Sequence, residues 1–85
     1  MMSALRDSAL RSAVLKLLSE RDPGKTICPS EAARHAFPDG WRDHMEATRQ
    51  VAISMATEGL IDICQRGRVI DLAREIKGPV RLCLR

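Results

Sequence analysis

Aromatic residues are almost missing from this chain of 85 residues, which contains one Trp, one Phe and no Tyr. Proteins that bind single-stranded nucleic acid usually stack successive bases on several aromatic side chains. One tryptophan and one phenylalanine cannot form such a surface. The composition therefore argues against single-strand binding by base stacking.

The motifs of common metal sites and enzymes are missing as well. The three cysteines are odd in number and lack CxxC spacing, which does not fit a disulfide framework. None of the cysteines and histidines forms the close pair of ligands that is typical of a zinc site. No HExxH motif, nucleophile elbow or glycine-rich phosphate loop is present. We therefore predict no catalytic residue, no metal ligand and no cofactor, and we do not expect an enzyme.

Long apolar runs are missing too, since no stretch approaches the ~20 residues that cross a bilayer. The segment Met1–Arg11 contains Asp7 and has no apolar centre, so it does not resemble a signal peptide. We expect no membrane contact and a reducing, cytoplasmic location, where cysteines stay unpaired.

The chain is long enough for one small domain, and we assign residues 1–85 to it. Hydrophobic residues make up 45% and charged residues 29%, as in globular proteins. Apolar residues recur at helical spacing in three segments: 5–20, 30–36 and 41–58. Ser30 and Asp39 are suitable N-caps for the second and third helices, and Gly59 closes the third.

The remaining residues predict a β-hairpin, because after the third helix apolar and polar residues alternate. Its strands are expected near residues 61–70 and 79–84, with a loop at 71–78 between them. We interpret Gly67 as a bulge that lets the first strand continue. The alternative is a tight turn at Arg66–Gly67.

The predicted order is helix, short strand at residues 25–28, helix, helix, strand, loop, strand. A turn-linked helix pair followed by a β-hairpin is the layout of the winged helix-turn-helix. We therefore predict a small α+β fold with three helices, a short first strand and a C-terminal β-hairpin wing. The alternative is a plain three-helix bundle with a separate ribbon, but an isolated ribbon is only marginally stable in water.

The predicted core contains the apolar residues that face inward at these spacings. They are Leu10, Val14, Leu17, Ala33, Phe37, Trp41, Met45, Ala52, Met55, Ile61, Ile63, Val80 and Leu82. Leu15 and Leu18 lie off the stripe of the first helix. Because a small domain gains from burying a second apolar face, we predict a homodimer that uses these two leucines.

Several blocks of residues resemble one known family. The blocks are Pro29-Ser30-Glu31-Ala32-Ala33-Arg34, Trp41-Arg42, Gly67-Arg68-Val69 and Gly78-Pro79-Val80-Arg81-Leu82. Together they are similar to the bacterial domain-of-unknown-function 3253 family, over nearly the whole chain. The resemblance implies a winged-helix fold and no established activity. The sequence departs from the family at Glu46 and Cys83, where the usual residues are Pro and a basic residue.

Positive charge is concentrated in the C-terminal third of the chain. Residues 60–85 carry six basic and three acidic side chains, whereas residues 23–59 carry four basic and five acidic ones. Basic side chains on a protruding wing can contact phosphates without reading the base sequence. We predict such contacts from four wing residues: Arg66, Arg68, Arg74 and Lys77.

The third helix, which enters the major groove in helix-turn-helix proteins, has a mixed outer face. Arg42, Arg49 and Gln50 are suitable donors to bases or phosphates, and we include them among the candidate DNA contacts. Glu46 lies within one helical turn of both arginines and can pair with each. Together with Asp43, it places negative charge where a phosphate would approach.

These observations favour weak binding of double-stranded DNA, mostly through the wing, in a transcription-related role. The alternative is a winged-helix protein-interaction module that binds no nucleic acid. That alternative draws on the acidic centre of the third helix and on the off-stripe residues Leu15, Leu18 and Ile53.

Overall fold

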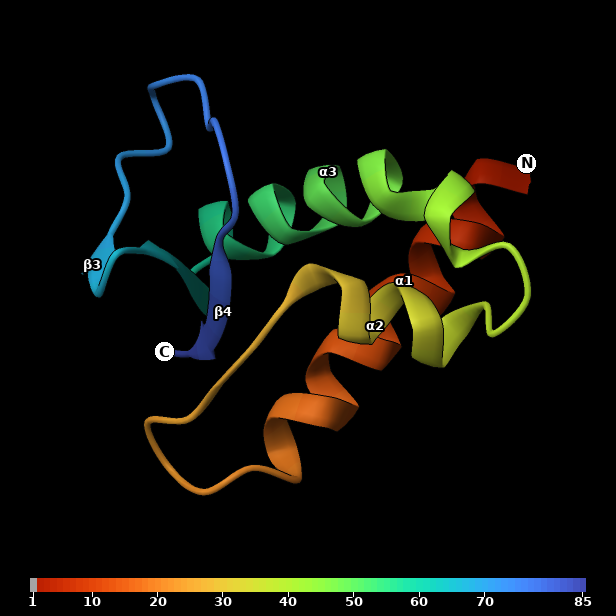
Figure 1. The fold of residues 1–85 in the computed structure, drawn as a ribbon, viewed down its shortest axis with the longest axis horizontal. Coiled ribbons are helices and arrows are strands. Elements are labelled where there is room, and N and C mark those ends of the chain that lie inside the picture. The colour runs from red at the N-terminus through yellow and green to blue at the C-terminus, as the bar shows by residue number, and fades with distance from the viewer. Residues whose placement is uncertain (1) are drawn as a thin grey trace.

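The computed structural model describes residues 2–85, which fold into helices packed on one antiparallel sheet (Figure 1). The elements in chain order are α1 (Met2–Ser19), β1 (Thr26–Ile27), α2 (Pro29–Ala36), the 3₁₀ helix η1 (Trp41–His44), α3 (Met45–Thr57), β2 (Ile61–Gln65), β3 (Arg68–Val69) and β4 (Arg81–Leu84). The predicted segments are confirmed, except that η1 forms the first turn of the third helix and the predicted strand 61–70 is divided. In this part of the chain, no helix has the length and apolar character needed to span a membrane.

The sheet has the strand order β1-β4-β2-β3, and every neighbouring pair is antiparallel. β1 precedes the helix pair in sequence, yet it forms the edge beside the last strand. A helix pair between a first edge strand and a C-terminal hairpin is the winged helix-turn-helix arrangement, which confirms the predicted fold class.

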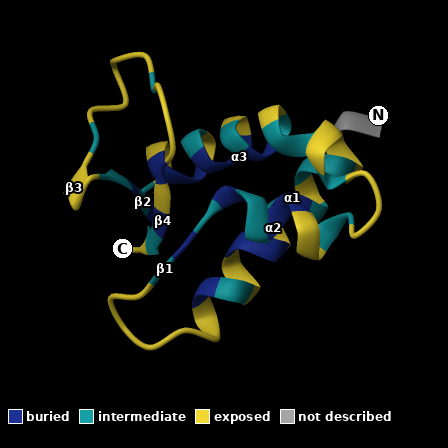
Figure 2. Ribbon diagram, viewed as in Figure 1, coloured by how far each residue is buried: buried dark blue, intermediate teal, exposed yellow. Residues whose placement is uncertain are grey.

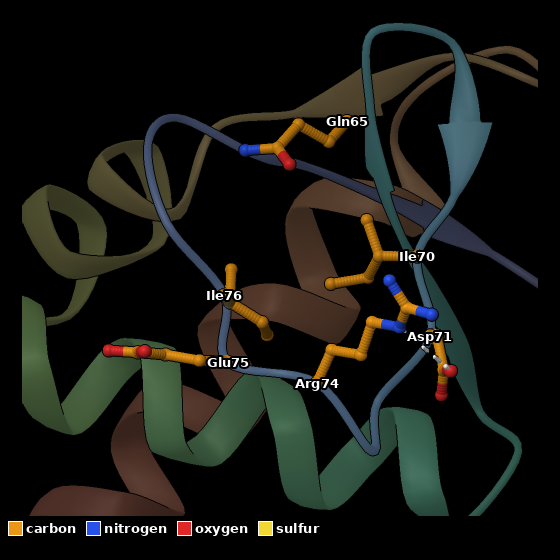
Figure 3. Close-up of a pocket in the computed structure, with 6 residues that line it drawn as sticks. All are labelled: Gln65, Ile70, Asp71, Arg74, Glu75 and Ile76. Carbon is orange, nitrogen blue, oxygen red and sulfur yellow. Dashed lines mark ion pairs between the residues drawn. The ribbon is translucent and has the colours of Figure 1, made fainter.

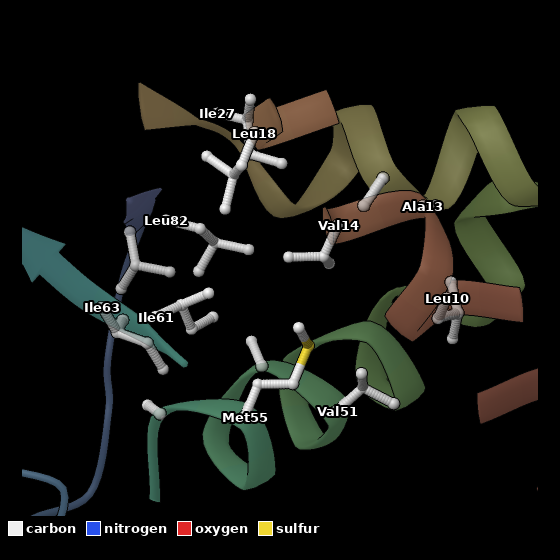
Figure 4. Close-up of a cluster of buried hydrophobic side chains, with 14 of the residues drawn as sticks. Leu10, Ala13, Val14, Leu18, Ile27, Val51, Met55, Ile61, Ile63 and Leu82 are labelled. Atoms are coloured by element: carbon white, nitrogen blue, oxygen red, sulfur yellow. The ribbon is translucent and has the colours of Figure 1, made fainter. Parts of the chain in front are cut away.

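The core lies between the helices and one face of the sheet (Figures 2 and 4). Strand register places Ile27, Leu82 and Ile63 in one row across β1, β4 and β2, and all three are buried. Most of the predicted core is buried, but four members are only partly buried at its edge: Leu17, Phe37, Trp41 and Met45. The alternation of β2 and β4 thus selects the buried face, as the sequence pattern predicts.

Leu18 belongs to this core, which corrects its assignment to a homodimer surface. Only 2% of Leu18 is exposed, whereas Leu15 is 36% exposed. α1 packs against α2, α3, β1 and β4, so a wide arc of its surface is covered and Leu18 lies inside that arc beside Ile27 (Figure 4). The predicted dimer interface therefore loses one of its two residues.

The predicted N-caps of α2 and α3 are both wrong. Cys28 is the N-cap of α2, and its backbone N–H donates to the Glu31 carboxylate at 2.6 Å. Pro29 can start the helix because its first turn leaves N–H groups unpaired in any case, so proline loses nothing there. The third helix is preceded by Gly40 with φ 79°, a left-handed conformation that suits glycine better than Asp39.

Gly59 ends α3 as predicted. Its φ is 83°, its N–H donates to the Ala56 carbonyl at 3.0 Å, and the Leu60 N–H donates to the Met55 carbonyl at 3.0 Å. This pair of bonds is the Schellman motif, which satisfies carbonyls at the helix end and turns the chain into β2.

The wing, defined as residues 66–80, starts with a tight turn and contains no bulge at Gly67. Arg66 has φ 55° and Gly67 has φ 80°, and Gln65 pairs with Arg68 across the two-residue turn. Two successive positive φ values give the twist that hairpin strands require, so the chain reverses here and the alternative interpretation is confirmed. Ile70 extends the pairing through its N–H, which donates to the Ile63 carbonyl at 2.9 Å.

Candidate nucleic-acid interface

The tip of the wing carries two exposed arginines, Arg66 and Arg68, on either side of Gly67. Neither forms an ion pair or a side-chain hydrogen bond with any residue that the structure describes. Arg66 is also the one non-glycine residue with a positive φ among residues 2–85. A bulky side chain in this conformation carries a backbone cost, and such positions concentrate at functional sites.

Behind the tip, residues 70–80 have no regular secondary structure, but two side chains hold them. Arg49 of α3 donates through Nη2 to the carbonyls of Ile76 at 3.3 Å and Gly78 at 3.4 Å. Gln65 of β2 donates through Nε2 to the carbonyls of Lys77 and Pro79, the latter at 3.1 Å. Four consecutive carbonyls are therefore fixed, alternately from α3 and from β2. Figure 3 shows the Gln65 side chain directed at this loop.

Two further basic residues of the wing have loose acidic partners. Arg74 Nε lies 3.7 Å from Asp71 Oδ2 (Figure 3), and Lys77 Nζ lies 3.9 Å from Glu75 Oε2. The side chains of Arg74 and Lys77 are 86% and 81% exposed. Ion pairs of this length at exposed positions contribute little to stability, so both cations can exchange their partner for a phosphate.

The wing loop also borders an open cavity of about 420 Å³, shown in Figure 3. Its lining mixes charged side chains with two isoleucines: Gln65, Ile70, Asp71, Arg74, Glu75 and Ile76. Small-molecule sites are predominantly apolar with few polar groups. This lining does not match such a site, and the cavity follows from the path of the loop.

On the outer face of α3, Glu46 has a different partner from the two arginines that the sequence suggested. Glu46 accepts a hydrogen bond from Gln50 Nε2 at 3.1 Å, and within residues 2–85 it pairs with neither Arg42 nor Arg49. Arg49 turns to the wing loop instead, because several carbonyls there accept from it at once. Gln50 and Glu46 satisfy each other, so α3 offers few unengaged donors to a base edge.

Arg42 lies in η1, the first turn of the third helix. Its guanidinium carbon lies 4.5 Å from the ring centroid of Trp41, which packs against the core. His44 stacks on Phe37 with ring centroids 4.0 Å apart, and its Nδ1 is buried without a hydrogen-bond partner among the described residues. The sequence did not predict these stacks, although it predicted Trp41 and Phe37 as core residues.

An ion pair connects α1 to the end of α3. The two terminal nitrogens of Arg11 donate to the two carboxylate oxygens of Glu58, at 2.8 Å and 2.5 Å. These hydrogen bonds, aided by the charge of Arg11, lower the pKa of Glu58 below its ordinary value. The pair adds a polar contact to the packing between α1 and α3.

Cys64 and Cys83 lie on the sheet face that points away from the core. Register places Cys83 opposite Asp62 and Cys64 opposite Arg81, so the two cysteines share this face. Burial, with the nearby Cys83 and Asp62, raises the pKa of the Cys64 thiol, which disfavours the reactive thiolate. No three His, Cys, Asp or Glu side chains gather into a metal site in the described part of the chain.

Sequence reasoning missed Gln65 and Arg34. Gln65 acts on carbonyls 12 and 14 residues away, and only the path of the loop brings them together. Arg34 lies with its guanidinium carbon 4.4 Å from the ring centroid of Trp41. No local pattern marks either residue, because both contacts depend on tertiary packing.

The helix order, the sheet order and the wing together define a winged-helix protein. The chain belongs to the family described as protein of unknown function (DUF3253), whose family model matches residues 7–85. A comparison with curated proteins finds none that matches this chain.

Proposed function

We propose that this winged-helix domain binds double-stranded DNA through the wing and that it acts in the cytoplasm in a transcription-related role. The observation that carries the proposal is the tip, where Arg66 and Arg68 are exposed and have no acidic partner within the described structure. Arg66 keeps a long cationic side chain at a position whose backbone favours Gly or Asn. A contact that needs the guanidinium group explains why arginine stands there.

The expected binding is weak and depends little on base sequence. Four wing cations are exposed: Arg66, Arg68, Arg74 and Lys77. Phosphate contacts position a protein on a duplex and carry no sequence information themselves. α3 adds little readout, because Gln50 is bonded to Glu46 and Arg49 to the loop.

The test is fluorescence anisotropy with a labelled duplex over a salt series. Four phosphate contacts give a slope of log affinity against log salt near about −3.6, since each contributes about 0.9. Arg68→Ala should reduce the magnitude of the slope by about 0.9 and weaken binding equally on unrelated sequences. Lys16→Ala is the matched control, because Lys16 lies on α1, pairs with Glu20 at 3.2 Å and should leave the slope unchanged.

Glu46→Gln extends this test. It removes a negative charge from the outer face of α3 while an amide can still bond to Gln50, so affinity should rise. No binding at about 50 mM salt and tens of micromolar protein, for wild type and Glu46→Gln alike, would contradict the proposal. Binding that ignores Arg68 and collapses in Gln50→Ala would place recognition on α3 instead.

A second candidate function is a protein-interaction module without nucleic-acid binding. The observation in its favour is the combination of an acidic outer face on α3 with exposed apolar residues on the sheet, among them Val69 and Leu84. Mixed polar and apolar surfaces of this kind are usual at interfaces between proteins. If neither the wild type nor Glu46→Gln binds DNA in the salt series, the result favours this second candidate.

A further inference from the structure

Most basic side chains in the described structure are already engaged. Seven have an acidic partner: Arg6, Arg11, Lys16, Arg21, Arg74, Lys77 and Arg85. Arg49 donates to loop carbonyls, and Arg81 donates to Thr26. Among residues 2–85, five basic side chains then remain without an acidic or hydrogen-bonded partner: Lys25, Arg34, Arg42, Arg66 and Arg68.

Four of these five form two pairs. Arg66 and Arg68 flank the tip of the wing, and Arg34 and Arg42 flank Trp41. The guanidinium carbons of Arg34 and Arg42 lie 4.4 Å and 4.5 Å from the Trp41 ring centroid. Arg34 comes from the last turn of α2 and Arg42 from η1, so the fold brings them to one ring from two elements.

The Trp41 cluster, defined as Arg34, Trp41 and Arg42, is built to present N–H groups to an anion. Trp41 is partly buried against the core and gives the two side chains a fixed support. A guanidinium group that stacks on an aromatic face keeps its N–H donors in its own plane, at the edge of the stack. Because both arginines are exposed, these edges are open to a ligand.

Two acids close in sequence to Trp41, Asp39 and Asp43, do not pair with the arginines of the cluster. Both carboxylates are exposed, and neither forms an ion pair or hydrogen bond with Arg34 or Arg42 in the described structure. They lower the local positive potential without occupying the donors. Each guanidinium group can therefore donate to the oxygens of a backbone phosphate.

The cluster lies at the end of α3 that is opposite the tip of the wing. In Figure 1, η1 and the turn before it are at the right-hand end of α3, while β3 and the tip of the wing are at the left. In helix-turn-helix proteins the helix before the recognition helix crosses the DNA backbone. We infer that the Trp41 cluster is a second phosphate-binding site, which holds the duplex backbone at the N-terminal end of α3 while the wing holds it at the other. This inference rests on the proposed function.

The experiment uses the full chain and two readouts. Trp41 is the single tryptophan, so its fluorescence reports on this cluster alone, while anisotropy of a labelled duplex reports on total binding. The variants are Arg34→Gln with Arg42→Gln together, each single change, and Arg68→Ala in the wing. Lys25→Gln is the matched control, because Lys25 is also exposed and unpaired in the described structure but lies beside β1.

We expect duplex addition to change Trp41 emission in the wild type and in Lys25→Gln. With the two added contacts the wild-type slope should be near about −5.4, and not the value of about −3.6 that the wing alone gives. The double variant should lose the emission change and reduce the magnitude of the slope by about 1.8, and each single variant should reduce it by about 0.9. The single changes keep the test valid if the double variant fails to fold in a circular dichroism spectrum. Arg68→Ala should reduce the slope and keep the change in Trp41 emission.

Each contrary result has a separate meaning. If Arg68→Ala reduces the slope but the Arg34 and Arg42 variants match the wild type, the second site is wrong and the wing proposal stands. If the wild type shows neither an anisotropy nor a fluorescence change at low salt, DNA binding itself is wrong and the second site falls with it. If duplex addition leaves Trp41 emission unchanged in the double variant while the salt slope stays at the wild-type value, the second site is also wrong.

Discussion

The guanidinium group of Arg49 lies 3.4 Å from the carbonyl oxygen of Gly78, a residue 29 positions further along the chain. The same group also donates to the Ile76 carbonyl, and Gln65 Nε2 donates to the carbonyls of Lys77 and Pro79. The position of the wing loop therefore depends on that of α3, although the loop has no regular secondary structure. A charged side chain with several donors is well suited to replace the missing sheet ladder.

Arg49→Gln should loosen the wing loop while the core stays folded. Losing charge-assisted bonds to two carbonyls should lower the local opening free energy by about 1–2 kcal/mol, which corresponds to roughly tenfold faster amide exchange. Hydrogen exchange at Ile70 and Arg74, whose N–H groups are bonded, measures this change. Gln50→Ala is the matched control, because Gln50 bonds only to Glu46 in the described structure and its loss should leave the loop unchanged.

The same variant separates two roles for Arg49 on DNA. If Arg49 only positions the wing, Arg49→Gln should lower the affinity for DNA and leave the salt slope unchanged. If Arg49→Gln instead reduces the slope by about 0.9, then Arg49 contacts a phosphate itself, and the prediction of a purely positioning role is wrong.

Arg66→Asn should stabilise the protein and weaken its binding to DNA. Arginine is strained at φ 55°, whereas Asn followed by Gly is the preferred sequence for a hairpin turn with two positive φ values. We expect a gain of about 0.5–1 kcal/mol in the free energy of unfolding and a loss of about 0.9 in the magnitude of the salt slope. Urea denaturation and the anisotropy series measure the two effects.

Arg68→Asn is the control for this pair of effects. Arg68 lies in β3, where asparagine is disfavoured, so the slope should fall without any gain in stability. Equal stabilisation by both substitutions would mean that removing positive charge, and not relieving the left-handed conformation, stabilises the wing.

Leu82→Ala and Leu84→Ala should differ strongly although the residues are two positions apart on β4. Leu82 is fully buried between Ile27 and Ile63, and its truncation should cost about 2–5 kcal/mol. Leu84 is 47% exposed at the end of the strand, so its truncation should cost less than about 1 kcal/mol. Urea midpoints at equal m-values test the difference, and similar costs would contradict the observed register.

The sequence predicted what depends on periodicity, and it failed where conformation depends on distant contacts. The change from helical spacing to alternation after Gly59 correctly marked the end of α3 and the buried face of β2. The left-handed Arg66 had no such signal, because arginine rarely adopts this conformation and a glycine next to it also fits a bulge. Leu18 was misplaced because a stripe of fixed width assumes one packing partner, whereas α1 contacts two helices and two strands.

For the candidate site, the sequence predicted the exposed cations of the wing but not the pairing of the other charges. Spacing allowed Glu46 to pair with Arg42 and Arg49. In the structure, Arg42 instead stacks on Trp41, and Arg49 donates to a carbonyl of the wing loop. Helical spacing defines which side chains can meet, and tertiary partners decide which of them do. Charge counts along the chain therefore located the wing without revealing the Trp41 cluster.

The ion pair of Arg11 and Glu58 should make stability depend on pH in the acidic range. The hydrogen bonds from Arg11 lower the pKa of Glu58 in the folded state below its value in the unfolded chain. The unfolded state then binds the proton more tightly, so the stabilisation is complete above the unfolded pKa and is lost as pH falls through the folded pKa. Arg11 stays charged throughout, which leaves Glu58 as the titrating partner.

A double-mutant cycle with Glu58→Gln, Arg11→Gln and the double variant isolates this pair from other carboxylates. Urea denaturation at about pH 7 and at about pH 2 should give a favourable coupling free energy in the first condition and a coupling near zero in the second. The coupling should also shrink in high salt, because both side chains are largely exposed. A coupling that persists after acidification would show that packing of the two side chains, and not the charge of Glu58, connects α1 to the end of α3.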